Sequence, residues 1–146
     1  MFFFKKKYLI NHPVFGVLKW TDSEFVGELY FEPVGTVVEV FFSCKKKEFC
    51  DDYERVWGVI KEMYFDIREK SAEAINRSDF DLYKYEISQE SLKDSNLVVE
   101  SLCFDMDLSV KFFWGVITHE QSETPVQVVT SFSLSDGSVQ FLGGGD

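Results

Sequence analysis

The residues of this sequence that could carry out chemistry are few, and they form two pairs. His119 and Glu120 place an imidazole beside a carboxylate, a combination used in general acid–base catalysis. Asp105 and Asp107 offer two carboxylates that could bind a divalent cation. Adjacent loop residues usually point apart, however, and two ligands without a third make a weak metal site. Polar turns explain both pairs more simply, and we expect no bound metal.

The three cysteines are Cys44, Cys50 and Cys103. An odd number in a chain of 146 residues does not suggest a disulfide framework, so we expect reduced thiols in a cytoplasmic protein. Cys44 and Cys103 fall on expected strands, where a buried cysteine acts as a small hydrophobic residue.

Sequence motifs for catalysis or cofactor binding are absent. The run 143–145 is glycine-rich, but no helix follows it as a phosphate-binding loop requires. The spacings of a nucleophile elbow and of a paired-histidine zinc helix are also missing. We therefore expect no cofactor and no enzyme activity. The alternative is a small enzyme with a dispersed active site around Asp105, Asp107, His119 and Glu120.

Hydrophobic residues alternate with polar ones near both ends of the chain. Over 24–32, apolar residues share one face and Glu24, Glu28 and Glu32 share the other, which is the period of a strand. Strands are also expected over 14–20, 35–43, 97–105, 109–117 and 126–134. Asp136-Gly137 marks a hairpin turn before a last strand that begins near Val139.

The middle of the chain has helical spacing. A single apolar stripe is formed by Phe49, Tyr53, Val56, Ile60, Met63 and Ile67. Asp66 followed by Glu69 resembles a capping pair, which predicts a second helix to Arg77. A short third helix is expected over 88–94, with Ser88 as its cap.

The order of these elements predicts the fold. Strands and helices are segregated along the chain rather than alternating, which is typical of an α+β fold. We expect one domain over 1–146. It should contain an antiparallel sheet of three N-terminal and about four C-terminal strands. Two or three central helices should cover one face of that sheet.

The formal net charge of −10 limits the partners. An acidic surface repels phosphate backbones, so binding to nucleic acid is disfavoured, whereas basic proteins are attracted. No segment has the length of a membrane span, and the start Met1-Phe2-Phe3-Phe4-Lys5 does not resemble a signal peptide. We expect a cytoplasmic protein that does not act in a membrane.

The segment 79–90 interleaves aromatic residues with acids, as an interface for a basic protein would. The candidate binding residues are Asp79, Asp81, Tyr83, Tyr85, Glu86 and Glu90. The alternative is that the aromatics only attach a long connection to the core.

Several short motifs carry a resemblance to a known class. They are Val14-Phe15-Gly16 with Trp20, the helical middle, the run 113–117 and the closing Asp136-Gly137 hairpin. Together they resemble small bacterial domains, some of which look like immunity proteins of polymorphic-toxin or contact-dependent growth inhibition systems. The resemblance implies non-catalytic binding and neutralisation of a cognate toxin domain, expected to be basic and nuclease-like. A structural or regulatory module, dimeric through a strand edge, is the other alternative. The oligomeric state is left open.

Overall fold

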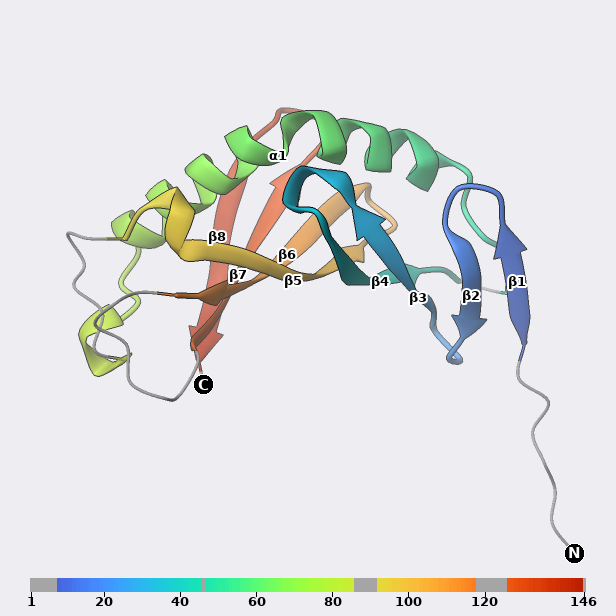
Figure 1. Cartoon of the computed structure of the whole chain (residues 1–146), viewed down its shortest axis with the longest axis horizontal. Coiled ribbons are helices and arrows are strands. Elements are labelled where there is room, and N and C mark those ends of the chain that lie inside the picture. The colour runs from blue at the N-terminus through green and yellow to red at the C-terminus, as the bar shows by residue number, and fades with distance from the viewer. Residues whose placement is uncertain (1–7, 46, 86–91, 118–125, 146) are drawn as a thin grey trace, which may run out of the picture.

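The computed structural model describes residues 8–45, 47–85, 92–117 and 126–145, which form one sheet and one long helix (Figure 1). The helix is α1, Asp52–Arg77. The strands are β1 (Leu9–His12), β2 (Gly16–Trp20), β3 (Glu24–Phe31), β4 (Thr36–Ser43), β5 (Leu97–Phe104), β6 (Ser109–Val116), β7 (Val126–Ser133) and β8 (Val139–Gly145). The short 3-10 helices are η1 (Glu32–Val34), η2 (Leu82–Tyr85) and η3 (Asp94–Asn96). No helix formed by the described residues is long and apolar enough to span a membrane.

The order of the strands in the sheet is the same as their order in the chain. Neighbouring strands pair antiparallel, with the exception of β4 and β5, which run parallel and bring Phe42 beside Phe104. A parallel pair needs a long crossover connection, and α1 lies in that connection. The sheet therefore consists of two antiparallel halves joined through one helical crossover.

The expected α+β fold with an antiparallel sheet and two or three central helices is wrong. The sheet is mixed, the described residues hold a single α-helix, and four strands precede it rather than three. The helix expected to begin at Asp66 is a continuation of α1. The Asp66 carboxylate caps nothing and instead pairs with Lys70 one turn later, at 3.1 Å. The backbone stays helical because the buried stripe continues through Ser71 to Ile75.

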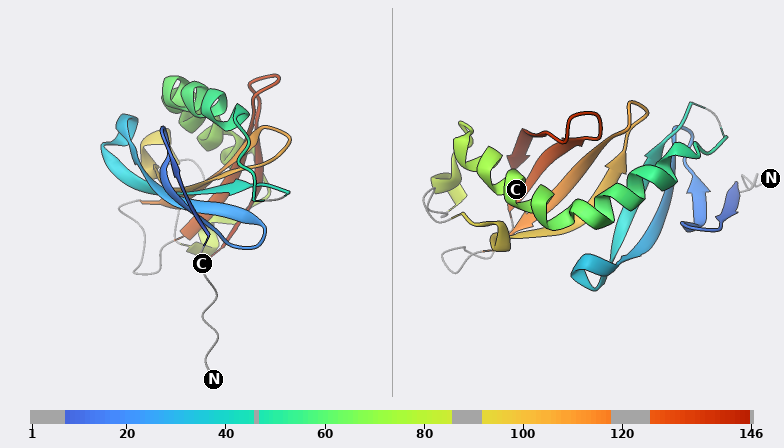
Figure 2. Two further views of the ribbon diagram at one scale, coloured as in Figure 1. Left: turned by 90° about the vertical axis from the view of Figure 1, so that its right-hand side faces the viewer. Right: turned by 90° about the horizontal axis from the view of Figure 1, so that it is seen from above.

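The core lies between α1 and one face of the sheet, and Figure 2 shows the helix lying across the strands. The buried positions of α1 include Tyr53, Val56, Ile60 and Ile67, which confirms most of the expected stripe. Met63 is partly buried at its edge. The sheet contributes large aromatic rings at the same depth. Fully buried side chains from both layers include Phe15, Phe25, Phe31, Phe42, Tyr64, Phe104, Phe112, Trp114 and Phe132.

A polar contact inside this core fixes the position of the helix. The Trp114 indole Nε1 donates to the Thr130 hydroxyl at 2.8 Å, and the Ser71 hydroxyl lies 2.8 Å from the same oxygen. Ser71 and Thr130 are fully buried, so each group depends on the others for hydrogen bonding. The contact links α1 to β6 and β7 at one register, which apolar packing alone would specify less strictly.

We expect the substitution Ile60→Ala to lower the free energy of unfolding by about 2–5 kcal/mol, because it leaves a cavity beneath α1. Ile60 is completely buried in the core, whereas Glu62 is exposed on the same helix. Glu62→Ala is the matched control and should change stability by less than about 0.5 kcal/mol. Urea denaturation measures both variants. Equal effects would show that this face of α1 does not contact the sheet.

Candidate functional site

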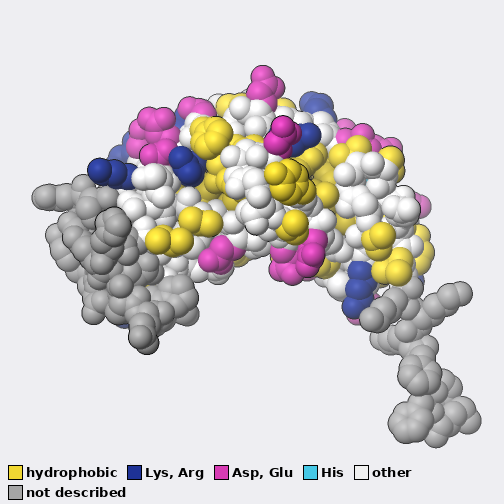
Figure 3. All heavy atoms as spheres, in the orientation of Figure 1, with side chains coloured by type: hydrophobic (Ala, Val, Ile, Leu, Met, Phe, Trp, Pro, Cys, Tyr) yellow, Lys and Arg dark blue, Asp and Glu magenta, His cyan; other side chains and the backbone are white. Residues whose placement is uncertain are grey.

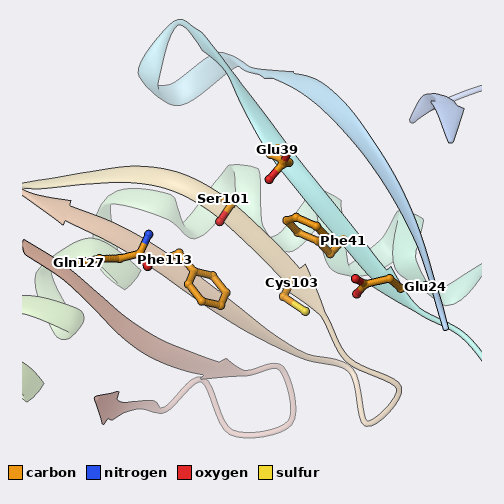
Figure 4. Close-up of a pocket in the computed structure, with 7 residues that line it drawn as sticks. All are labelled: Glu24, Glu39, Phe41, Ser101, Cys103, Phe113 and Gln127. Carbon is orange, nitrogen blue, oxygen red and sulfur yellow. The ribbon is translucent and has the colours of Figure 1, made fainter. Parts of the chain in front are cut away.

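Among the described residues, no α-helix covers the face of the sheet opposite α1, and we call it the open face. Residues of β4 alternate between the two faces, so Val38, Val40 and Phe42 are buried while Glu39 and Phe41 point away from the helix. Figure 4 views this open face, with α1 behind the strands. In Figure 3, acidic side chains are visible on the lower edge of the molecule, on the side away from the helix, as well as along the helix at the top.

A groove of about 350 Å³ crosses the middle of the open face. Its cause is a difference in side-chain size between neighbouring strands. The small residues Ser101 and Cys103 of β5 lie between Phe41 on β4 and Phe113 on β6 (Figure 4). Phe41 is paired with Cys103, and Ser101 is paired with Phe113. We call this depression, with Glu24, Glu39 and Gln127 around it, the β5 groove.

Carboxylates on β3 and β4 make this side of the groove acidic. Glu28 and Glu39 are directly paired across the two antiparallel strands. Like charges at such a position destabilise a sheet. Within the described residues, neither they nor Glu24 form an ion pair with lysine or arginine. The sheet therefore keeps an unfavourable charge arrangement that a basic partner would relieve.

A β-bulge adds a further acid to the open face. The register of β5 against β6 shifts between Val99 and Ser101, so Glu100 and Ser101 both face away from the helix. Glu100 accepts a hydrogen bond of 2.9 Å from the Gln127 amide. Its carboxylate lies over Gly115, where a Cβ atom would collide with it. Glycine at 115 thus makes room for the acid.

Positive charge on the open face is limited. Lys111 forms an ion pair with Asp105, with 3.6 Å between the ammonium nitrogen and a carboxylate oxygen. Lys19 is exposed on β2 opposite Val26. Next to the acidic pair, Tyr30 and Val37 are cross-strand partners and expose 63% and 55% of their surface. Acids and uncovered apolar groups thus lie side by side on this face.

The thiol of Cys103 is poorly suited to nucleophilic chemistry. Burial, reinforced by the nearby carboxylates of Asp105 and Glu24, raises the pKa of Cys103 to about 11. A thiol needs to lose its proton to act as a nucleophile, so this group is inert near neutral pH. Burial also raises the pKa of Cys44. The three cysteines are free thiols in the structure.

The two carboxylates considered for catalysis, Asp105 and Asp107, make contacts around the turn between β5 and β6. Asp107 accepts hydrogen bonds from the Ser109 hydroxyl at 2.6 Å and from its backbone N–H at 2.9 Å, and these bonds lower the pKa of Asp107. Asp105 pairs with Lys111. His119 and Glu120 lie outside the described residues. Across the part of the chain that the structure describes, no cluster of metal-binding side chains is found.

The residues predicted from segment 79–90 are described only in part. Asp79 and Asp81 are exposed, and an Asp81 carboxylate oxygen accepts the Lys84 backbone N–H at the start of η2. Tyr83 and Tyr85 belong to η2, but their side chains, like Glu86 and Glu90, lie outside the description. Phe80 packs on Phe141 of β8. That contact favours attachment to the core for this ring.

Sequence reasoning did not select the residues of the open face. Glu24 and Glu28 were recognisable as the polar side of an alternating strand. Their relation to Glu39, Phe41 and Phe113 depends on strand pairing, which the sequence pattern does not contain. The available signal was the mixture of acids and aromatics at solvent-facing positions of 24–43.

We predict that Cys103 reacts slowly with iodoacetamide. With a pKa of about 11, only about one thiol in a thousand is ionised at pH 8. Mass spectrometry after timed labelling should show slower modification of Cys103 in the folded protein than in the protein unfolded in urea. The rate should rise as the pH approaches 11. Equal rates in the two states at pH 8 would contradict the environment described here.

The sequence and the fold were also compared with known proteins. Searches against protein-family models, curated proteins and solved structures found no match in any of the three.

Proposed function

We propose that this chain is an immunity-type protein that binds and neutralises a cognate basic toxin domain in the cytoplasm, without catalysis. The observation that supports this proposal best is the open face of the sheet. Glu28 and Glu39 oppose each other there beside exposed Tyr30 and Val37. A protein that worked alone would gain stability by replacing one acid of this pair with a lysine. Retaining both is useful when a positive partner covers them.

Electrostatics favours a basic protein as the partner. The net charge of −10 attracts positive domains over a distance and speeds their association. The same charge opposes binding of nucleic acid. An acidic face can also occupy the surface with which a basic nuclease holds its substrate, so binding alone would block the toxin. The toxin needs no chemical modification in this mechanism.

The enzyme alternative has less support from the described residues. Asp107 is engaged with Ser109, Asp105 is paired with Lys111, and the Cys103 thiol is protonated near neutral pH. The Cys103 thiol itself donates to an Asp105 carboxylate oxygen at 3.9 Å, and that carboxylate is already paired with Lys111. His119 and Glu120 remain the parts of that alternative to test by substitution.

We predict that reversing the charge of the acidic pair abolishes protection. The variant Glu28→Lys/Glu39→Lys replaces attraction by repulsion at the centre of the proposed interface. The measurement is growth of cells that co-express each variant with the protein product of the gene directly upstream, together with titration of that purified protein. Affinity should fall at least about tenfold, and the difference from wild type should shrink as the salt concentration rises.

Three controls make this experiment specific. Glu62→Lys/Glu69→Lys makes the same change in net charge at exposed positions of α1 and should keep protection. Asp79→Lys tests the surface predicted from segment 79–90. His119→Ala should also keep protection if no catalysis is involved. Full protection by the Glu28/Glu39 variant would exclude the open face, and loss of protection in a folded His119→Ala protein would favour an enzyme.

A further inference from the structure

The β5 groove has a chemical character that is more specific than negative charge. Aromatic rings from Phe41 and Phe113 lie on its two sides, with the neutral Ser101 and Cys103 between them. Along β4, Glu39 and Phe41 occupy successive positions on this face, and Glu24 is paired with Ser43, the next position along. One ring is therefore flanked by a carboxylate at each end, as Figure 4 shows.

We propose that the β5 groove is the seat for an arginine side chain of the partner protein. This inference rests on the proposed function, because it takes a basic protein as the partner. It goes further by naming the type of residue on that partner that binds in the groove. A guanidinium group can lie flat against an aromatic ring and still donate hydrogen bonds from its edge. The groove offers rings along its sides and carboxylates at its margin, which are the two surfaces that such a group uses.

Lysine fits this arrangement less well. Its ammonium group is compact and strongly hydrated, so it loses more hydration when it enters a groove lined by rings and a neutral thiol. It also lacks the planar fork that pairs with a carboxylate through two hydrogen bonds. Both residues would be attracted by the acids, but arginine gains an additional contact from Phe41 and Phe113.

A second copy of the same chain is a poor occupant. Two open faces would bring Glu28, Glu39 and Glu100 of each copy against those of the other, in a protein whose net charge is already −10. Repulsion of this kind opposes face-to-face association. Charge complementarity therefore favours a basic partner rather than self-association.

The test uses the full chain and two capped peptides of equal charge, hexa-arginine and hexa-lysine. Isothermal titration calorimetry at low ionic strength should show that hexa-arginine binds about threefold more tightly, the size expected for an exposed cation–π contact. Phe41→Leu and Phe113→Leu keep the groove apolar but remove a ring. Each should reduce the preference for arginine, and the double variant should abolish it.

A matched pair of variants separates the effect of the net charge from the effect of where the charge lies on the protein. Glu39→Gln removes one carboxylate at the groove and should weaken both peptides by about twofold or more. Glu62→Gln makes the same change of charge on exposed α1 and should leave both affinities close to wild type. Circular dichroism and thermal unfolding confirm that each variant is folded. Sedimentation of the free protein reports whether a second copy occupies the face instead.

The outcomes distinguish the arginine seat from the proposed function. No measurable peptide binding, equal affinities for the two peptides, or an arginine preference that survives the double Phe→Leu change would overturn the seat. Self-association that peptide does not displace would also overturn it. Protection of cells from the toxin domain is scored separately with the wild-type chain. An intact arginine preference without protection would overturn the proposed function and leave the seat in place.

Discussion

The burial of α1 against the sheet is the contact on which the rest of this structure depends. The helix contributes one apolar stripe, and the sheet supplies a continuous layer of aromatic and aliphatic side chains beneath it. A sheet has two faces, however, and the described residues contain a single helix long enough to cover one of them. The opposite face must therefore be stable in contact with water or with another molecule, and its composition follows from that requirement.

The composition of the open face differs from what solubility alone would produce. A solvated antiparallel face commonly carries polar residues at alternate positions. Here the paired Glu28 and Glu39 lie beside the exposed ring of Tyr30, and a bulge directs Glu100 to the same side. The acids oppose each other in the isolated protein, while apolar groups stay in water. Both unfavourable features would be relieved by the partner proposed here, a protein surface that is basic and contains apolar groups.

Local patterns predicted the elements better than their arrangement. Alternation located most strands, and the stripe containing Tyr53, Ile60 and Ile67 located the helix. The Asp66–Glu69 spacing was misread as a cap, because an acid at that position can equally pair with Lys70 inside a continuous helix. The parallel pairing of β4 with β5 joins segments far apart in the sequence. The β5 groove depends on that same pairing, so neither the mixed sheet nor the groove could be inferred from periodicity.

The agreement between strand order and chain order has a consequence for how the protein folds. Within β1–β4 and within β5–β8, each strand pairs with its neighbour in sequence. Each of these pairings therefore closes only a short segment of chain. The parallel pairing of β4 with β5 is different, since it closes the whole connection from Cys44 to Asn96. The entropy of loop closure is thus concentrated in one event. Docking of α1 onto both halves supplies the contacts that compensate for it, which couples assembly of the core to formation of the open face on the other side.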